Sequence, residues 1–127
     1  MIDHIGINVA DMERASAFYD RVLGALGHRR LLDHGVAIGY GTEQPAFWIS
    51  TFEGVGPNRE SHVAFVAPDA HSVRAWFDEA VAAGAEVLHE PRLWPEYHPG
   101  YFGAFVRDTE GNNIEACCHT GDAGSQA

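Results

Sequence analysis

Apolar and polar residues alternate with a period of two where the chain begins. The apolar residues are Ile5, Ile7 and Val9, and the positions beside them are His4, Gly6 and Asn8. The same alternation returns around residues 62–67, where the apolar residues are Val63, Phe65 and Ala67. Each segment is therefore predicted to be a strand with one buried face.

The two strands open two copies of one longer sequence unit. From His4 the chain reads HIGINVADMERASAFYD, and from His62 it reads HVAFVAPDAHSVRAWFD, and the two align without a gap. The identical pairs are His4 and His62, Asp11 and Asp69, Ala17 and Ala75, and Asp20 and Asp78. Apolar residues also match at the key positions between them, so we interpret the chain as a tandem repeat.

A helix is predicted after the strand in each copy. Asp11 and Asp69 stand where an N-cap carboxylate accepts hydrogen bonds from the amides of the first turn. Gly27 and Gly84 are suitable residues to end the helices. The apolar stripe of the first helix consists of Ala15, Phe18, Tyr19, Val22 and Leu23, and that of the second of Val73, Trp76, Phe77, Ala80 and Val81.

Three short strands are predicted after each helix. They lie at residues 29–32, 35–40 and 46–51 in the first copy, and at 86–90, 100–106 and 113–118 in the second. A reverse turn is predicted at 108–111, and loops at 52–61 and 91–99. The fold class is α+β, with two tandem βαβββ modules that form cupped mixed sheets. We expect one domain over residues 1–120, with modules at about 1–53 and 60–119, and a disordered tail at 120–127.

The chain has 127 residues, about the size of one domain, and 46% of them are hydrophobic. Its 18 acidic and 8 basic residues give a formal net charge of −10, which argues against nucleic-acid binding, because phosphate contacts need clustered Lys and Arg. We find no signal-peptide pattern and no apolar run that could span a membrane. Cys117 and Cys118 would face opposite sides of a strand, so we expect reduced thiols and a cytoplasmic protein.

Eight histidines are an unusual number for this length and favour a metal or proton-transfer site. His4 and His62 occupy equivalent positions of the repeat, on the same face of the first strand of each module. Glu115 alternates with apolar neighbours and so points away from the face that packs inward. The simple alternative is that these histidines and Glu115 are surface residues of the sheets. Two imidazoles and one carboxylate, however, suit catalytic Fe(II), Mn(II) or Zn(II).

The motifs DHIGINVAD, HVAFVAPD and YHPGYFGAFVRDTEGNNIE, together with the repeat, resemble the vicinal oxygen chelate superfamily over about residues 2–119. This superfamily includes glyoxalase I, extradiol dioxygenases, fosfomycin-resistance transferases and bleomycin-binding proteins. The resemblance implies that one divalent metal ion (Fe, Mn, Zn or Ni) is bound by His4, His62 and Glu115. It also implies a substrate whose two adjacent oxygens bind the metal.

The chain departs from glyoxalase I at one position. Glyoxalase I has a fourth ligand, a glutamate on the last strand of its first module. When residues 42–43 are aligned with 109–110, Trp48 stands opposite Glu115, and a shift by one residue brings Ile49 there. Neither side chain is a metal ligand or a base, so we expect poor glyoxalase I activity. The set of three ligands looks more like that of the dioxygenases or the fosfomycin transferases.

The predicted loop after Pro91 continues into a segment, 94–102, that carries several aromatic residues and a histidine. It is either a surface loop with a hydrophobic clamp or the wall of a pocket. In the second case His98 is the acid–base catalyst and Tyr97 or Tyr101 is a hydrogen-bond donor. The resemblance to extradiol dioxygenases supports this in part, because they have a similar histidine ahead of a tyrosine and the final glutamate.

Substrate contacts are expected from Asn8, which shares a strand face with His4, and from the aromatic residues Phe47 and Trp48. Alternation sends Phe47 and Trp48 to opposite faces of their strand, so core packing is the expected role of at least one of them.

We therefore expect a metal-dependent enzyme, dioxygenase-like or lyase/isomerase-like, that acts on a small molecule with vicinal oxygens. The alternatives are a metal-free small-molecule-binding or antibiotic-resistance protein of the same fold, and a structural or protein-interaction role. The resemblance also implies a homodimer, sometimes with exchanged modules, in which His4 comes from one chain and His62 and Glu115 from the other. We expect no nucleic-acid or membrane partner.

Overall fold

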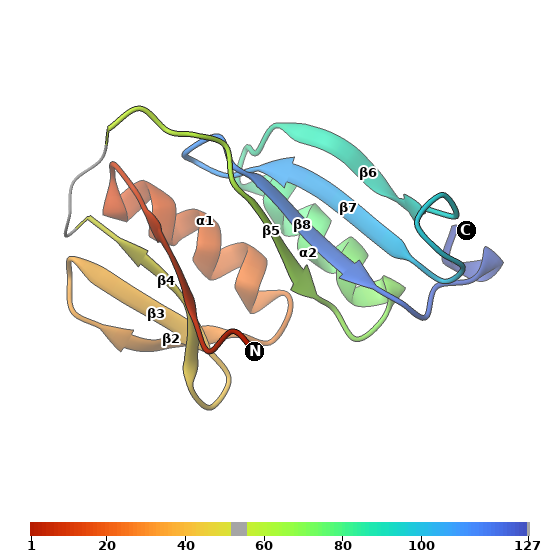
Figure 1. The fold of residues 1–127 in the computed structure, drawn as a ribbon, viewed down its shortest axis with the longest axis horizontal. Coiled ribbons are helices and arrows are strands. Elements are labelled where there is room, and N and C mark those ends of the chain that lie inside the picture. Colours follow the sequence, from red (N-terminus) through yellow and green to blue (C-terminus); the bar gives the residue numbers. More distant parts are fainter. Residues whose placement is uncertain (52–55, 127) are drawn as a thin grey trace.

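Two modules with the same order of elements follow each other along the chain (Figure 1). The computed structural model describes residues 1–51 and 56–126. The first module contains β1 (Ile5–Asn8), α1 (Met12–Gly24), β2 (Arg29–Asp33), β3 (Ala37–Gly41) and β4 (Pro45–Ser50). The second contains β5 (His62–Val66), α2 (Ala70–Ala82), β6 (Val87–Leu93), β7 (Phe102–Arg107) and β8 (Asn113–Cys118). The predicted α+β fold of two tandem βαβββ modules is confirmed.

Each module forms its own mixed sheet of four strands. The strand orders are β1-β4-β3-β2 and β5-β8-β7-β6. In both sheets the first strand of the module pairs in parallel with the last one, and the remaining neighbours are antiparallel. The last strand therefore lies in the middle of each sheet, beside the first. This places β8, which carries Glu115, next to β5, which carries His62.

Both helices begin at the predicted N-caps. Asp11 Oδ1 and Asp69 Oδ1 each accept a hydrogen bond from the amide three residues later, at 3.1 Å and 2.8 Å. Gly27 and Gly84 follow the helices with φ angles of 86° and 85°, a conformation that favours glycine. Local sequence therefore sets where each helix starts and stops.

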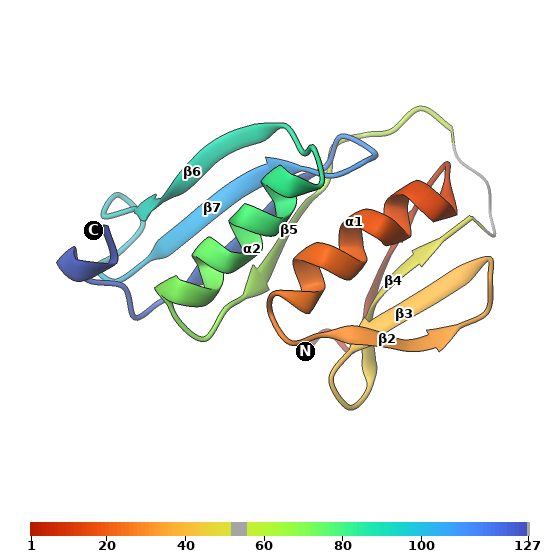
Figure 2. The same cartoon turned by 180° about the vertical axis from the view of Figure 1, so that it is seen from behind.

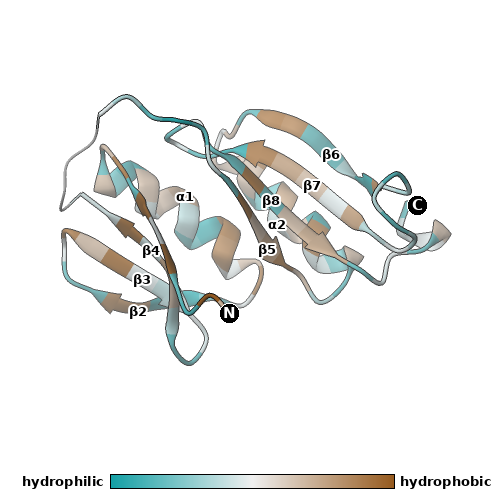
Figure 3. Ribbon diagram, viewed as in Figure 1, coloured by the Kyte–Doolittle hydropathy of each residue, from teal (hydrophilic) through white to brown (hydrophobic). Residues whose placement is uncertain are grey.

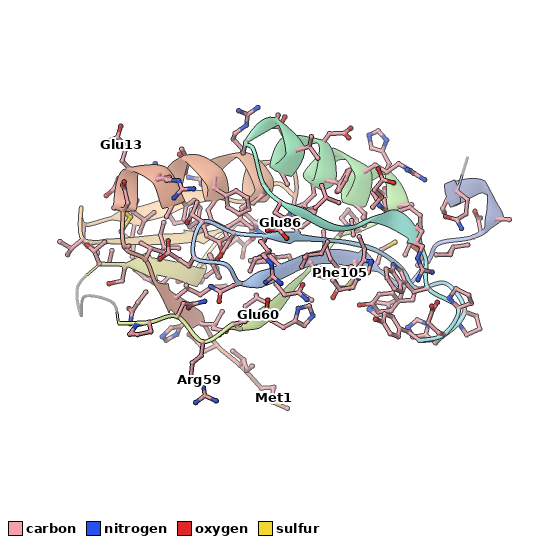
Figure 4. The ribbon with its side chains drawn as sticks, turned by 90° about the horizontal axis from the view of Figure 1, so that it is seen from above. Met1, Glu13, Arg59, Glu60, Glu86 and Phe105 are labelled. Atoms are coloured by element: carbon pink, nitrogen blue, oxygen red, sulfur yellow. The ribbon has the colours of Figure 1, made fainter. Side chains whose placement is uncertain are left out.

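The helices and sheets form two layers. α1 and α2 lie side by side on one face of the two sheets, as Figure 2 shows. In the view of Figure 4 both helices lie on one side of the strands, and the labelled Met1 and Arg59 project on the other side. No described helix covers that second side, which we call the open face. Figure 3 shows the hydrophobic character of β1, β5 and β8 and the hydrophilic character of the segment that leads into β5.

The core lies between the helices and the sheets. Alternate residues of the central strands point into it, including Phe47 and Ile49 on β4 and Ile114, Ala116 and Cys118 on β8. The residues between them on β8, among them Glu115, therefore point to the open face. Cys117 and Cys118 are both unpaired and fall on opposite faces, as predicted. None of the described helices is long and apolar enough to cross a membrane.

A buried hydrogen-bond network joins the two modules. Tyr19 on α1 donates its hydroxyl to Asp108 Oδ2, in the turn between β7 and β8, at 2.6 Å. Asp108 Oδ1 also accepts hydrogen bonds from the amides of Glu110 and Asn112, at 2.9 Å and 2.8 Å. Burial, and then the charge of Asp108, raises the pKa of Tyr19 well above its usual value. The phenol therefore remains a hydrogen-bond donor.

The strand β6 is longer than predicted. Residues 91–93 belong to it, whereas the sequence had placed them in a loop that begins at Pro91. β6 is the edge strand of its sheet, and its register with β7 shifts between His89 and Arg92. A bulge in an edge strand accommodates a residue that has no amide hydrogen to donate, which explains how the strand continues through Pro91.

Two further expectations need correction. Residues 120–127 were expected to be disordered, but Ala123–Gln126 form a 3₁₀ helix. The Leu93 amide donates to Gln126 Oε1 at 3.1 Å, so the segment is held against β6. Val81, predicted to belong to the buried stripe of α2, is 48% exposed, because that stripe runs through Val73, Trp76 and Ala80 and leaves Val81 beside it. The predicted loop at 52–61 lies partly outside the described residues.

Candidate metal centre

His62 and Glu115 meet on the open face of the second sheet. His62 Nε2 lies 3.0 Å from Glu115 Oε1. The Glu115 side chain is only 2% exposed, whereas 49% of the His62 side chain is exposed. The predicted proximity of these two residues thus follows from the pairing of β5 with β8, in which Ala64 stands opposite Glu115. A buried carboxylate requires polar partners, and His62 is one of them.

Tyr101 is the second partner of Glu115. Its hydroxyl donates to Glu115 Oε2. Gly103 leaves the room for this contact, because a Cβ there would lie 3.1 Å from Glu115 Oε2 and 3.3 Å from the Tyr101 ring. Burial, and then the hydrogen bond to Glu115, raises the pKa of Tyr101 above its usual value. Tyr101 therefore stays protonated and fixes the orientation of the carboxylate.

The second nitrogen of His62 is also held. His62 Nδ1 lies 3.0 Å from the backbone oxygen of Asn113, which only accepts hydrogen bonds, so Nδ1 carries a proton. Nε2 then faces an acceptor, Glu115 Oε1. A proton or a metal cation must therefore lie between Nε2 and the carboxylate oxygen. A backbone carbonyl that holds the outer nitrogen of an imidazole is typical of histidine ligands in metal sites.

His4 does not join this pair within one chain. It precedes β1 in the other sheet, its side chain is 60% exposed, and its Nδ1 lies 2.7 Å from Asp3 Oδ1. Among the described residues no group of three or more His, Cys, Asp and Glu side chains could hold a metal ion. Two of the three predicted ligands therefore lie together within one chain, and His4 lies apart from them.

The strand registers settle which residue of the first module corresponds to Glu115. Glu115 pairs with Ala64, two residues after His62, and Trp48 pairs with Gly6, two residues after His4. Trp48 is therefore the equivalent residue. Ile49, the alternative from the alignment, is fully buried in the core.

The Trp48 indole lies across Gly39 on β3. A Cβ at Gly39 would be 2.8 Å from Trp48 Cζ2, so only glycine leaves space for the ring. His34 stacks over the indole, with ring centroids 6.4 Å apart and planes 5° from parallel. The open face of the first module therefore presents a flat aromatic surface where the second module presents a carboxylate.

Aromatic side chains surround the His62–Glu115 pair. Phe105 stacks on His62 with a centroid distance of 6.0 Å, and Trp94 packs against Phe105 at 5.2 Å. Trp94 donates its indole N–H to the backbone oxygen of Gly103 at 3.0 Å, and the Arg92 guanidinium lies 3.4 Å above its ring. Sequence reasoning missed Phe105 and Arg92 as site residues. The signal for Phe105 was the alternation of β7, which places it on the open face opposite Glu115.

The predicted acid–base residue His98 lies behind Tyr101 rather than beside Glu115. The His98 and Tyr101 ring centroids are 5.3 Å apart. His98 Nδ1 is 2.7 Å from the backbone oxygen of Pro99, and Nε2 is 2.9 Å from Nδ1 of His119, a residue that the sequence did not single out. Tyr97 is 55% exposed and packs on Tyr101. Of the three predicted catalytic residues, Tyr101 is the one whose contact with Glu115 the structure records.

The predicted substrate contacts separate into two groups. Asn8 lines a polar depression of about 260 Å³ between β1 and the segment 56–61. Trp48 lies on the open face, as described above. Phe47 is only 4% exposed and packs against Tyr19 and Phe65, so its expected role as a substrate contact is replaced by a role in the core.

Cys117 adds a thiol to this face. It lies two residues after Glu115 on the same strand face and is 7% exposed. Burial raises the pKa of its thiol, so Cys117 stays protonated as a small apolar neighbour of Tyr101.

Comparisons with known proteins agree with this architecture. Residues 1–116 match the family model of the Glyoxalase/Bleomycin resistance protein/Dioxygenase superfamily. The chain is similar to a glyoxalase/bleomycin resistance protein from Albidiferax ferrireducens T118, with 26% identity, a TM-score of 0.79, and coverage of 91% of this chain and 96% of that one. No curated protein matched the sequence.

Two more distant structures share the fold. Lactoylglutathione lyase from Agrobacterium tumefaciens is 21% identical, with a TM-score of 0.67 and coverage of 93% of this chain and 92% of that one. The fosfomycin resistance protein FosX from Mesorhizobium loti is 16% identical, with a TM-score of 0.67 and coverage of 99% and 96%. Because the family model spans nearly the whole chain, the protein belongs to the glyoxalase/bleomycin resistance protein/dioxygenase superfamily.

Proposed function

We propose that the protein is a divalent-metal-dependent enzyme that acts on a small molecule with two adjacent oxygens. One observation supports this most: His62 Nε2 and Glu115 Oε1 converge to 3.0 Å while the backbone of Asn113 holds the other nitrogen of His62. Ligand atoms at bond lengths of about 2.1 Å around one metal ion are separated by about this distance. Fe, Mn, Zn and Ni are the candidate ions.

The third ligand in this proposal is His4 of a second chain. Within one chain His4 stands on the other sheet and points to solvent. Two copies that exchange modules would place the open face of the first module of one chain over the open face of the second module of its partner. The same arrangement would bring Trp48 opposite Glu115 and cover Phe105 and Trp94. The proposed enzyme is therefore a homodimer with two equivalent sites.

Each residue has a distinct role in this proposal. Bound metal would act as a Lewis acid for the two substrate oxygens and would stabilise the negative charge that develops on them. Tyr101 keeps one oxygen of Glu115 engaged, so that the other remains directed at His62. Phe105 and Trp94 exclude water from this region, which strengthens electrostatic interactions there. A metal held by these three residues alone would also be able to bind substrate and water.

The named activities of the similar structures are consistent with several reactions for this protein. A lactoylglutathione lyase and a fosfomycin resistance protein share this fold. A second carboxylate that could serve as a base would have to stand at the position of Trp48. We therefore propose a flat or apolar substrate, such as an aromatic diol, rather than a 2-oxoaldehyde adduct. While its Nε2 binds no metal, His98 remains the candidate for proton transfer to a substrate that reaches past Tyr101.

Metal analysis of purified variants tests the centre. We expect one Mn(II) or Fe(II) per chain with at least about tenfold weaker binding after Glu115→Ala or His62→Ala, since loss of a ligand costs at least as much as loss of its supporting contacts. Glu96→Ala is the matched control, because Glu96 is an exposed carboxylate that pairs with Arg92. Stoichiometric Mn(II) or Fe(II) binding that survives the double substitution His62→Ala/Glu115→Ala would overturn the assignment.

Mixing of two inactive variants tests the exchange of modules. His4→Ala chains lack one ligand, and His62→Ala/Glu115→Ala chains lack the other two. If modules are exchanged, a mixed dimer regains one complete site, so about one site in four recovers after random reassembly. If each chain builds its own site, no Mn(II) binding returns. Sedimentation of the unmodified protein as a monomer at micromolar concentration, with metal bound, would also refute the dimer.

A further inference from the structure

A second pair of ring nitrogens converges away from the proposed centre. His98, in the segment between β6 and β7, places Nε2 2.9 Å from Nδ1 of His119, which follows β8. The two rings are nearly parallel, with centroids 5.0 Å apart and planes 16° from parallel. Both residues are exposed. Tyr101 separates this pair from Glu115, because its ring contacts both histidines and its hydroxyl contacts the carboxylate.

Backbone contacts hold the two histidines together. Gly100 has a φ of 90°, and a Cβ there would lie 2.6 Å from the backbone oxygen of His119. The Gly121 amide donates to the Gly100 oxygen at 2.8 Å. The segments that carry His98 and His119 therefore lie in direct main-chain contact, which only glycine at position 100 permits. The fold thus holds the two residues next to each other through their main chains.

The hydrogen bonds determine which nitrogen of His98 is free to bind a ligand. His98 Nδ1 lies 2.7 Å from the backbone oxygen of Pro99, so it carries the proton. Nε2 then presents its lone pair, and in the metal-free protein it accepts the Nδ1 proton of His119. A metal ion competes for the position of that proton, since imidazole ligands bind in their neutral form and metal binding releases protons. Support of the outer nitrogen by a backbone carbonyl is the usual arrangement for metal-ligating histidine.

The separation of the two nitrogens is that of a hydrogen bond, and a metal ion can replace the shared proton if the exposed rings turn their lone pairs toward one point. Two imidazole nitrogens at about 2.0–2.1 Å from one ion, on adjacent positions, are about 3 Å apart. We propose that His98 and His119 form a second metal site, separate from the His62–Glu115 centre, for an imidazole-seeking transition ion. Cu(II) is the strongest candidate, followed by Ni(II) and Zn(II), because imidazole suits these ions and affinity follows this order. No further His, Cys, Asp or Glu of the described residues completes a larger group, so water fills the remaining positions.

Copper titration in a background that lacks the first centre tests this site. His4→Ala/His62→Ala removes two of the three ligands proposed for that centre. In this background we expect one Cu(II) per chain, with a nitrogen-ligand signature in its electron paramagnetic resonance spectrum. Binding should also quench fluorescence, because Trp94 and Tyr97 belong to the same aromatic cluster as Tyr101.

Adding His119→Ala or His98→Ala to this background should weaken Cu(II) binding at least about tenfold, because each removes one of two ligands. Adding His71→Ala should leave it unchanged, since His71 is an exposed histidine on α2. Circular dichroism confirms that each variant is folded. Full affinity without both His98 and His119, or no stoichiometric copper in the starting background, would overturn the proposal. The His62–Glu115 centre is assessed separately, by Mn(II) binding to the His98→Ala/His119→Ala variant.

Discussion

Removal of one hydroxyl group tests how strongly the two modules depend on each other. In Tyr19→Phe the ring stays in the core, and only the 2.6 Å hydrogen bond to Asp108 is lost. Tyr19 is fully buried and Asp108 is 7% exposed, so water cannot readily replace the missing donor. Asp108 keeps its bonds from the Glu110 and Asn112 amides, which limits the damage to one contact.

The structure sets the size of the effect. A hydrogen bond to a charged group contributes about 1.5–3 kcal/mol, so the free energy of unfolding should fall by about 2 kcal/mol. At about 2.1 cal/mol/K per residue, a chain of 127 residues has an unfolding entropy of about 0.27 kcal/mol/K. The expected fall in Tm is therefore about 7 °C.

Tyr40→Phe is the matched control. Tyr40 donates to Asp20 Oδ1 at 2.8 Å, within the first module, and Arg30 also binds this carboxylate at 2.8 Å and 2.7 Å. Loss of the Tyr40 hydroxyl should lower the free energy of unfolding by about 1 kcal/mol. Urea denaturation and calorimetry of both variants at one fixed protein concentration measure the difference. The free energy of unfolding could fall equally in both variants, or by less than about 1 kcal/mol in Tyr19→Phe. Either result would show that the hydrogen bond between the modules stabilises the protein no more than one within a module.

The same variant has a signature at alkaline pH. The pKa of Tyr19 is raised by burial in the folded protein, whereas an unfolded tyrosine titrates near about 10. The neutral phenol therefore stabilises the fold fully below about pH 10, and this contribution is lost as the pH rises further. The slope is about 1.4 kcal/mol per pH unit for one such group. Stability of Tyr19→Phe should fall less steeply above pH 10 than that of the unmodified protein.

Two further predictions follow from the first module. Gly39→Ala should destabilise the protein by about 1–3 kcal/mol and shift tryptophan fluorescence, because its Cβ would lie 2.8 Å from the Trp48 indole. The control is Gly24→Ala at the end of α1, where no atom lies within 4 Å of the added Cβ, so this substitution should be neutral or stabilising. A similar loss of stability in both variants would contradict the steric reasoning. The protein should also convert the hemithioacetal of methylglyoxal and glutathione slowly. Its rate should be about 10²–10⁴-fold lower than that of an enzyme with a general base at the position of Trp48. Rapid lactoylglutathione formation with Ni(II), Zn(II) or Mn(II) would show that another residue serves as the base.

The fold could be predicted because its signals are local and occur twice. Asp11 and Asp69 start helices through their own side chains, and the repeat fixes the order of strands around them. The course of β6 through Pro91 could not be predicted, because a bulge and an edge position reverse the usual effect of proline. The ordered segment 123–126 also depends on a distant contact, that of Gln126 with Leu93.

The candidate site could be predicted in part. His62 and Glu115 share a face because strand periodicity and the repeat place them on neighbouring strands. The position of His4 depends on how modules associate, which strand patterns do not encode. The pairing of His98 with His119 rests on a main-chain contact at Gly100, between segments that are far apart in sequence. Such contacts leave no periodic pattern in a single sequence.

The hydrogen bond between Tyr19 and Asp108 also bears on the history of the duplication. In the alignment of the two halves, the partner of Tyr19 is Phe77, which has no hydroxyl, and the partner of Asp108 is Gly41, which has no carboxylate. A chain made of two first modules would carry two phenols and no acceptor, and a chain made of two second modules would carry two acceptors and no phenol. The halves have therefore diverged into complementary pieces, and neither can be replaced by a copy of the other without losing the bond that joins them.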